Sequence, residues 1–324
     1  MQRNVNLLPF NTFQVSSLAE SFLQINNLSD VGILSDFDNP LYLGQGANVL
    51  FVSPVIKRPV VKNNLKGIKV LNENGEEVLI EAAAGEDWHE FVMSSVSNGW
   101  SGVENLAYIP GTVGAAAVGN IGAYGQTISN VVVEVKTLYK SYLNPECQFD
   151  YRESIFKNNS DFVTSVVFKL SKTAKFATDY ESRYESLKNY LPNGTLTPKI
   201  IAEAIIKIRT DKLPDWKKIG TAGSFFKNPV ISQEKFILLQ KEIKELQSYP
   251  AKSDLVKVPA GRLFDELGWK GKRVGKVATY EKHALTVINL GGATGQEILD
   301  YTQQMQVSVK RAYDIDLEPE VKII

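Results

Sequence analysis

Residues 111–125 form a glycine-rich run, GTVGAAAVGNIGAYG, which limits the regular structure available to this part of the chain. Five of its fifteen residues are glycine, and each glycine inside a helix or strand costs up to about 1 kcal/mol relative to alanine. Two interpretations follow. Either the run forms a set of tight turns, or its backbone comes close to a phosphate and presents several N–H groups to it.

A second glycine-containing stretch, LGQGANVLF, occupies residues 43–51. It does not fit the dinucleotide-binding fingerprint, because no third glycine follows at the required spacing and a strand is predicted next in place of a helix. The lysine of a Walker A motif is also missing. If these two stretches bind a nucleotide cofactor, they do so outside the Rossmann scheme.

The length of 324 residues predicts two or three domains. Lys plus Arg and Asp plus Glu both number 36, so no basic excess indicates a nucleic-acid partner. The single cysteine, Cys147, fits a reducing compartment. The N-terminal residues lack a signal-peptide pattern, and no run of about 18 apolar residues indicates a membrane span. We therefore expect a cytoplasmic protein.

Alternating apolar residues predict strands in the first half of the chain, at 49–53, 67–71, 77–83, 131–139 and 162–170. Helices are predicted from helical spacing and capping residues. Asp87 is a plausible N-cap for a helix beginning near 88, and Thr197 for a helix with Pro198 in its first turn. A third helix is expected near 233–246, and Thr294 with Glu297 predicts a capping box before a fourth.

These elements predict a β-rich α+β protein with a smaller α/β domain near residues 216–315. The closing residues, IDLEPEVKII, are predicted to form a strand interrupted by Pro319.

Ser224 lies in GTAGSFFKNPV, between a glycine and two phenylalanines. It is not in the Gly-x-Ser-x-Gly motif of hydrolases. The chain has two histidines, of which His89 is expected to be structural or exposed, while His283 could line a site. So few ligands give no expectation of a metal site. Ser224 therefore donates a proton or hydrogen bond to a ligand, or it simply bonds backbone in a turn.

Several stretches together resemble the UDP-N-acetylenolpyruvoylglucosamine reductase (MurB) family of flavoenzymes. The resemblance covers nearly the whole chain, in the family's order and with compatible spacings. The stretches that carry it are FNTF, LGQGANVLF, ENLAYIPGTVGAAAVGNIGAYG, YRESIFK, RTDKLPD, AGSFFKNPV, VKVPAG and LEPEV.

The resemblance implies an FAD-binding region of the vanillyl-alcohol-oxidase (PCMH) type, made of two α+β subdomains, and a C-terminal α/β substrate-binding domain. The implied boundaries are 1–60, with 316–324 near the active site, then 61–215 and 216–315. FAD would bind non-covalently. The residues implied to hold it are Gly44, Gly46, Ala47, Asn48, Val49, Pro110, Gly111, Thr112, Gly114, Asn120, Gly122, Ala123 and Tyr124.

The resemblance also implies a reaction in which NADPH, through FAD, reduces UDP-N-acetylglucosamine enolpyruvate to UDP-N-acetylmuramate. Ser224 matches the family's proton donor. Arg152 and Glu320 match the groups that stabilise charge on the enolpyruvyl group, and Glu320 fits by position better than Glu318. A glutamate beside an enolate must be protonated or bridged to help in this way.

Substrate contacts are implied by the same alignment for Tyr184, Arg209, Lys212, Asn228, Tyr249, Lys257 and His283. Tyr249 and Lys257 match a pair that binds the diphosphate. Tyr184 is the best match to a tyrosine that covers the uridine, with Tyr180 and Tyr190 as alternatives. At His283, relatives have glutamine, so the role of this residue stays open.

Two other functions compete with this one. An oxidase of the same superfamily often anchors FAD through histidine or cysteine in the glycine-rich loop, but residues 110–125 contain neither. A flavin- or nucleotide-sugar-binding protein without activity would not need Ser224, Arg152 and Glu320, which are all present. We expect a monomer with small-molecule substrates and no nucleic-acid or membrane partner.

Overall fold

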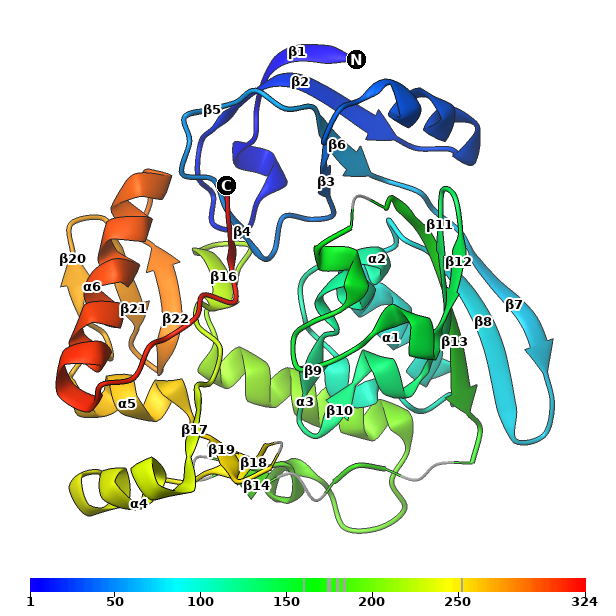
Figure 1. The fold of residues 1–324 in the computed structure, drawn as a ribbon. Coiled ribbons are helices and arrows are strands. Elements are labelled where there is room, and N and C mark those ends of the chain that lie inside the picture. The colour runs from blue at the N-terminus through cyan, green and yellow to red at the C-terminus, as the bar shows by residue number, and fades with distance from the viewer. Residues whose placement is uncertain (160, 174–175, 179–180, 183–184, 252) are drawn as a thin grey trace. The chain divides into compact units, whose positions relative to one another are not determined.

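The computed structural model describes all residues except 160, 174–175, 179–180, 183–184 and 252, and the side chains of 181–182 and 185–186. The chain divides into two compact units, each built from three segments (Figure 1). The first unit comprises Met1–Val5, Ala19–Gln45 and Ile56–Asp211. The second unit comprises Asn6–Leu18, Gly46–Val55 and Lys212–Ile324. The predicted boundaries at 60/61 and 215/216 stay a prediction.

The first unit contains an antiparallel sheet of five strands in the order β12-β11-β13-β8-β7. Its strands are β7 (Ile68–Glu73), β8 (Glu77–Ala83), β11 (Val132–Thr137), β12 (Ser141–Leu143) and β13 (Val163–Ser171). Val78, Ile80 and Ala82 alternate along β8 and are fully buried. They pack in one core with apolar residues of α1 (Trp88–Ser97), α2 (Val113–Gly119) and α3 (Pro198–Lys212).

A second sheet of the first unit has the order β1-β2-β6-β3, with β5 paired to β2. Its strands are β1 (Gln2–Asn6), β2 (Leu18–Ile25), β3 (Leu41–Leu43), β5 (Val55–Ile56) and β6 (Val60–Asn63). Strand β6 runs parallel to β2 and β3. Two short hairpins pair β9 (Gly122–Ala123) with β10 (Gln126–Thr127) and β14 (Glu181–Ser182) with β15 (Glu185–Ser186).

The second unit has its own core around a four-stranded sheet in the order β16-β22-β21-β20. The strands are β16 (Gly220–Ser224), β20 (Arg273–Val274), β21 (Val277–Tyr280) and β22 (His283–Asn289). Helices α5 (Ala260–Glu266) and α6 (Gly295–Tyr313) contribute apolar side chains to this core. Three short strands, β17 (Val230–Ser232), β18 (Tyr249–Pro250) and β19 (Leu255–Lys257), form a smaller sheet beside α4 (Gln233–Glu242). Finally, β23 (Lys322–Ile323) pairs in parallel with β4 (Val49–Leu50).

The predicted α+β class and the capped helices are confirmed. The side chains of Asp87, Thr197 and Thr294 each accept a hydrogen bond from the backbone three residues later, and Thr294 with Glu297 forms the predicted capping box. Helix α4 ends at Glu242 instead of 246, because Ile243 adopts an extended backbone. The strand predicted at 49–53 is confined to Val49–Leu50.

The glycine-rich run is not simply a set of tight turns, because residues 113–119 form the helix α2, and its approach to a phosphate stays a prediction. Thr112 caps the start of this helix, and three consecutive alanines favour its central turn. Gly114 allows the helix to pack closely, since a Cβ there would lie 2.6 Å from the Cβ of Ala84. The left-handed backbone of Asn120 ends the helix.

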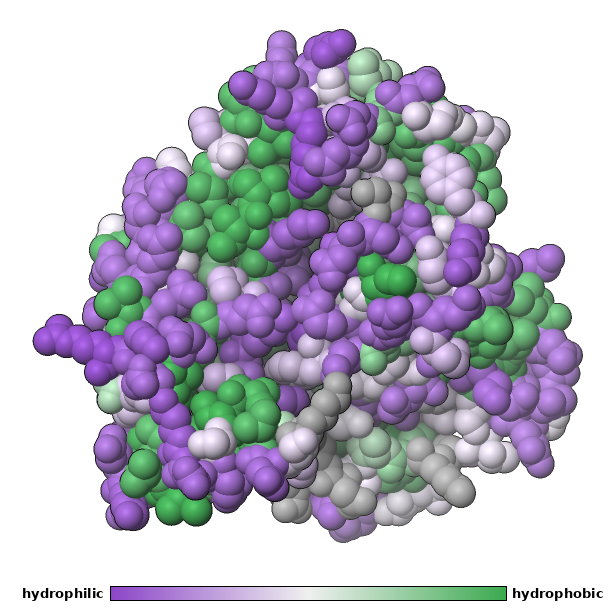
Figure 2. Space-filling view, in the orientation of Figure 1, coloured by the Kyte–Doolittle hydropathy of each residue, from purple (hydrophilic) through white to green (hydrophobic). Residues whose placement is uncertain are grey.

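The face of the molecule drawn in Figure 2 is mainly hydrophilic, with apolar side chains gathered in separate patches. Among the residues that the structure describes, no helix combines the length and apolar composition that crossing a bilayer requires.

Candidate active site

Ser224 lies at the end of β16, directly opposite Thr286 of β22. The register between these strands shifts between Thr221 and Ser224, where Gly223 has a left-handed backbone (φ +74°). The next two residues, Phe225 and Phe226, are buried, with ring centroids 5.1 Å apart. Strand pairing and aromatic packing therefore hold the half-buried Ser224 in a fixed position.

Glu320 is held beside Ser224 by backbone hydrogen bonds within the second unit. Its N–H donates to the carbonyl of Phe225 at 2.8 Å, and its carbonyl accepts from Nδ2 of Asn48 at 3.0 Å. Phe226 also forms a β-bridge with Pro319. The structure thus brings together two predicted catalytic residues, Ser224 and Glu320, that lie far apart in the sequence.

The predicted cofactor stretch contributes Gly46, Ala47, Asn48 and Val49 to the second unit. Gly46 has a left-handed backbone (φ +67°), and a Cβ there would overlap the carbonyl of Phe10. The carbonyl of Asn48 accepts from the N–H of Lys322 at 3.0 Å, next to the β23–β4 pair. The stretch is therefore tied to the segment that carries Glu320.

The predicted substrate residues of the second unit lie on different elements. Asn228 accepts, through Oδ1, a hydrogen bond from the N–H of Ala260 at 2.9 Å. Tyr249 and Lys257 are directly opposed on β18 and β19, so their side chains share one face of the small sheet. His283 contacts Oγ1 of Thr286, the partner of Ser224, at 3.2 Å through Nδ1. Lys212 is the last residue of α3.

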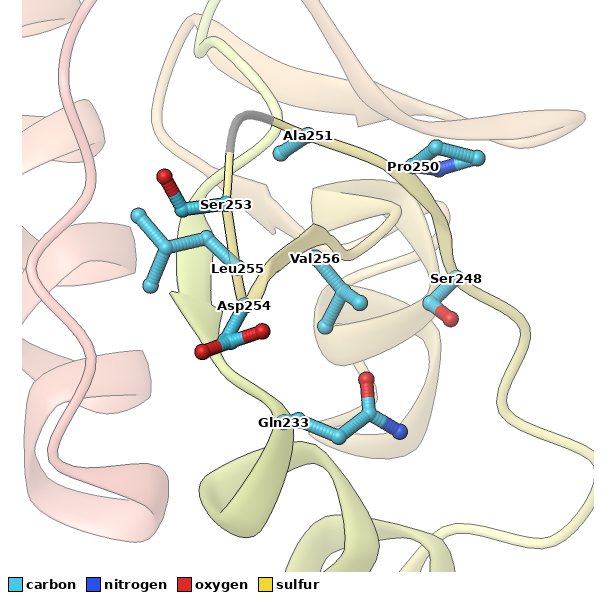
Figure 3. A pocket seen from close by; sticks show the side chains of 8 residues that line it. All are labelled: Gln233, Ser248, Pro250, Ala251, Ser253, Asp254, Leu255 and Val256. Carbon is cyan, nitrogen blue, oxygen red and sulfur yellow. The ribbon is translucent and has the colours of Figure 1, made fainter.

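A pocket of about 440 Å³ opens beside this small sheet (Figure 3). Pro250 and Val256 line it, and they are cross-strand partners one residue away from Tyr249 and Lys257. Strand positions on both sides of β19 line the pocket, since Leu255 and Val256 both contribute to it. The other lining residues are Gln233, Ser248, Ala251, Ser253, Asp254 and Leu255. None of the residues that line the pocket is a predicted site residue.

In the first unit, Arg209, Tyr124 and Arg152 form one electrostatic group. Nε of Arg209 donates to the carbonyl of Tyr108 at 3.1 Å, and its guanidinium is hydrogen-bonded to the side chain of Tyr124. Burial lowers the pKa of Arg209, and the nearby positive charge of Arg152 lowers it further. A carboxylate or phosphate would be attracted to this pair of cations.

The remaining predicted cofactor residues of the first unit surround α2. A Cβ on Gly44 would lie 2.7 Å from Oγ1 of Thr112, and a Cβ on Gly122 would lie 3.3 Å from Nη1 of Arg152. The N–H of Gly111 donates to Oε1 of Gln45 at 2.9 Å. Pro110 precedes this residue, and Ala123 lies in β9.

The backbone N–H groups that begin α2 are already used inside the protein. That of Val113 donates to the carbonyl of Glu86, and that of Gly114 to the carbonyl of Ala84, both at 2.9 Å. By contrast, Oδ1 of Asn120 is buried without a hydrogen-bond partner among the described residues. This oxygen fits a donor on a ligand, such as the N–H or hydroxyl groups of a flavin cofactor.

Tyr184 and Tyr180 lie outside the described residues. Tyr190, the third candidate to cover a uridine, ends a 3₁₀ helix (Leu187–Tyr190), and its ring centroid lies 5.9 Å from Nζ of Lys207. His89 is structural, as predicted, since its Nδ1 accepts from the N–H of Tyr108 at 3.1 Å.

Sequence reasoning missed three residues that support the site. Tyr108 provides the carbonyl that binds Arg209, Gln45 binds the N–H of Gly111, and Thr286 joins His283 to the strand that carries Ser224. The contacts of Tyr108 and Gln45 join residues distant in sequence, and Thr286 contacts His283 locally but pairs with the distant Ser224. Tyr108 and Gln45 had a local signal, because they lie in the singled-out stretches ENLAYIPG and LGQGANVLF, whereas Thr286 had none.

Comparisons with known proteins agree on one family. The family model of the UDP-N-acetylenolpyruvoylglucosamine reductase C-terminal domain matches residues 214–324, and that of an FAD binding domain matches residues 39–141. A UDP-N-acetylenolpyruvoylglucosamine reductase of Bacteroides fragilis is 38% identical over 100% of both chains. That of Flavobacterium johnsoniae is also 38% identical, over 100% of this chain and 99% of the relative.

A solved structure has a similar fold. The crystal structure of UDP-N-acetylenolpyruvylglucosamine reductase from Thermus caldophilus superposes with a TM-score of 0.69, at 22% identity, over 99% of this chain and 98% of that chain. The family models and the full-length relatives together show that this chain is an FAD-binding member of the UDP-N-acetylenolpyruvoylglucosamine reductase family.

Proposed function

We propose that this enzyme reduces UDP-N-acetylglucosamine enolpyruvate to UDP-N-acetylmuramate, a precursor of peptidoglycan, with NADPH as the hydride source. The observation that carries the proposal is the hydrogen bond of 2.8 Å from the N–H of Glu320 to the carbonyl of Phe225, which holds Glu320 beside Ser224.

FAD fits the residues predicted to bind it. Oδ1 of Asn120 is buried and lacks a donor among the described residues, so it can accept a hydrogen bond from the cofactor. Gly44, Gly114 and Gly122 pack closely against other residues of the protein, which keeps the predicted cofactor stretches together. When bound, FAD supplies the chemistry that takes a hydride from NADPH and delivers it to C3 of the enolpyruvyl group. The residues that would hold it also include Gly46, Ala47, Asn48, Val49, Pro110, Gly111, Thr112, Ala123 and Tyr124.

Ser224 donates its hydroxyl proton to C2 after hydride addition at C3, which completes the reduction of the double bond. A serine hydroxyl is a weak acid in water, but the carbanion at C2 is a strong base, so transfer needs only a short, fixed contact. Arg152 and Glu320 stabilise the negative charge that develops on the enolpyruvyl carboxylate and C2, which lowers the barrier more than it strengthens ground-state binding.

Other residues bind and orient the substrate. Tyr249 and Lys257, on one face of the small sheet, offer a phenol and an ammonium group to the diphosphate. Lys212, Asn228 and Arg209 contribute further polar contacts. His283 can donate or accept a hydrogen bond to the substrate, and we assign the uridine cover to Tyr184, with Tyr180 and Tyr190 as alternatives.

We further propose a cytoplasmic monomer with small-molecule substrates and no nucleic-acid or membrane partner. The balanced charge and the single buried cysteine support this setting. The domains would be an FAD-binding region of residues 1–215, divided near 60, and a substrate domain of residues 216–315.

An anaerobic absorbance experiment tests the function. The purified protein is recorded alone, after addition of NADPH, and then after addition of the enolpyruvyl substrate. We expect the flavin bands to bleach with NADPH and to return on addition of the substrate. Absence of flavin, even after FAD is supplied, would contradict the assignment. Rapid reoxidation by oxygen but not by the substrate would favour an oxidase, and flavin bands that NADPH does not bleach would favour a binding protein without activity.

Ser224→Ala tests the proton donor. We expect it to slow the return of the flavin bands by about 10²- to 10⁴-fold, the usual contribution of general acid catalysis, while NADPH still bleaches them. Ser16→Ala, at an exposed serine of the same unit, is the matched control and should react at the wild-type rate. An unchanged rate for Ser224→Ala would remove this residue from the mechanism.

A further inference from the structure

The C-terminal residues from 317 onward form a strap that carries Glu320 along the second unit. On one side of the strap, Lys322 pairs with Val49 in the β23–β4 ladder, and the N–H of Ile324 donates to the carbonyl of Leu50 at 2.9 Å. On the other side, the strap contacts the residues that follow Ser224. The backbone of Glu320 is held from both sides, by Asn48 and by Phe225.

The contact next to Ser224 is reinforced by an ion pair. Nζ of Lys227 lies 2.7 Å from Oε1 of Glu318, and the N–H of Lys227 donates to the carbonyl of Glu318 at 2.9 Å. These two residues are therefore joined through both backbone and side chain. Lys227 lies three positions after Ser224, and Glu318 lies two before Glu320, so the pair connects the two chain segments close to both catalytic residues.

The two ends of this ion pair have different environments. The side chain of Lys227 is 12% exposed, whereas that of Glu318 is 70% exposed. A pair with one well-solvated partner contributes little to stability, which makes a purely structural role weak. The effect of the ion pair on the position of the catalytic groups is larger than its effect on stability, because a displacement of about 1 Å can lower the reaction rate about 100-fold.

We propose that Lys227 and Glu318 are positioning residues that fix the separation of Ser224 and Glu320, and thereby the delivery of the proton to C2. This inference rests on the proposed function. It predicts that breaking the pair affects the step that uses Ser224 and Glu320, and leaves the reaction with NADPH unchanged.

The test compares two half-reactions in single-turnover, anaerobic stopped-flow experiments on the FAD-loaded protein. Bleaching by NADPH measures the first, and return of the flavin bands with the enolpyruvyl substrate measures the second. For Glu318→Gln we expect the second to slow by about tenfold or more, within the range that misplacement produces. The first should stay within about twofold of wild type, and the melting temperature should hardly change.

Two further variants separate positioning from general damage. Lys227→Glu combined with Glu318→Lys restores an ion pair with reversed charges, and we expect it to recover most of the lost rate. Asp316→Asn removes a different ion pair immediately before the strap, that of Asp316 with Lys310 at 2.8 Å, and should react like wild type. An unchanged second half-reaction in Glu318→Gln, or equal slowing of both half-reactions, would overturn the inference.

Ser224→Ala and Glu320→Gln are measured in parallel. If these two slow the second half-reaction while Glu318→Gln does not, the positioning role fails and the proposed function stands. If Ser224→Ala and Glu320→Gln are also without effect, the catalytic roles of Ser224 and Glu320 fail, and the positioning role fails with them. If the flavin bands of the wild-type protein do not return with the enolpyruvyl substrate, the proposed function itself fails.

Discussion

At the scale of single residues, the first unit holds several non-glycine residues in a left-handed backbone close to its predicted site. Tyr108, Asn120, Tyr124 and Arg152 all have φ between +41° and +58°. Such conformations cost of order 1 kcal/mol or more each and persist where the surrounding structure imposes them. Here they aim the carbonyl of Tyr108 at Arg209 and place Asn120 at the end of α2. These four residues place left-handed backbone at the predicted site of the first unit, although other residues with positive φ, such as Asn4, Asn39 and Gln148, lie elsewhere in the unit.

Lys62 gives a prediction at the same scale. Burial in β6, with Lys66 nearby, lowers the pKa of Lys62 to about 8 from its ordinary 10.5. Between pH 8 and pH 10.5 the unfolded chain binds more protons than the folded protein. The loss of stability caused by burying the charged Lys62 is therefore complete below pH 8 and disappears as the pH rises toward 10.5. Lys62→Met should therefore raise the stability by about 1–2 kcal/mol at pH 7, discounted for partial exposure, and by much less at pH 10.

Urea unfolding at pH 7 and pH 10 measures this difference. Lys57→Met, at an exposed position of the same unit, is the matched control and should leave the stability unchanged at both pH values. Equal stabilisation by Lys62→Met at the two pH values would show that packing, and not protonation, is responsible.

At the scale of elements, two helical glycines of the second unit should respond in opposite ways to alanine. A Cβ on Gly295, at the start of α6, would overlap the backbone carbonyl of Phe51. A Cβ on Gly261, inside α5, would meet nothing closer than the Cβ of Leu285 at 3.9 Å. We expect Gly295→Ala to destabilise by about 2–3 kcal/mol, and Gly261→Ala to stabilise by about 0.5–1 kcal/mol.

Thermal unfolding of the two variants tests this contrast, because both make the same chemical change in a helix of the same unit. A neutral Gly295→Ala would mean that α6 can shift away from Phe51 at little cost. A destabilising Gly261→Ala would mean that this glycine has a role beyond packing space.

The sequence predicted those elements that are specified by neighbouring residues. Helices α1, α3 and α6 begin where Asp87, Thr197 and Thr294 indicate, because a cap acts within one turn. Helix α2 was missed because glycine has a low helix propensity. The glycines are needed for tertiary packing, since Gly114 lies too close to Ala84 for a larger side chain. The resemblance supplied Ser224 and Glu320, but residue spacing could not show that Asn48, Phe225 and Glu320 meet.

At the scale of the whole molecule, the second unit is assembled from three separated parts of the chain. Phe13, Val15 and Leu50 are fully buried in its core but lie outside residues 212–324. The carbonyl of Phe13 also accepts from Nδ2 of Asn289 at 2.9 Å. The family model of the C-terminal domain, in contrast, begins at residue 214. The recognisable sequence domain is therefore shorter than the structural unit.

This difference predicts that residues 212–324 alone do not fold cooperatively. Each large apolar side chain contributes about 1.5–3 kcal/mol when buried, so losing Phe13, Val15 and Leu50 removes about as much free energy as a typical domain has in total. We expect poorly dispersed amide signals and a broad urea transition for this fragment, compared with a cooperative transition for the full chain. A dispersed spectrum and a sharp transition would show instead that the three missing side chains are dispensable, and that the 6–18 and 46–55 segments add to a core that the C-terminal residues can form by themselves.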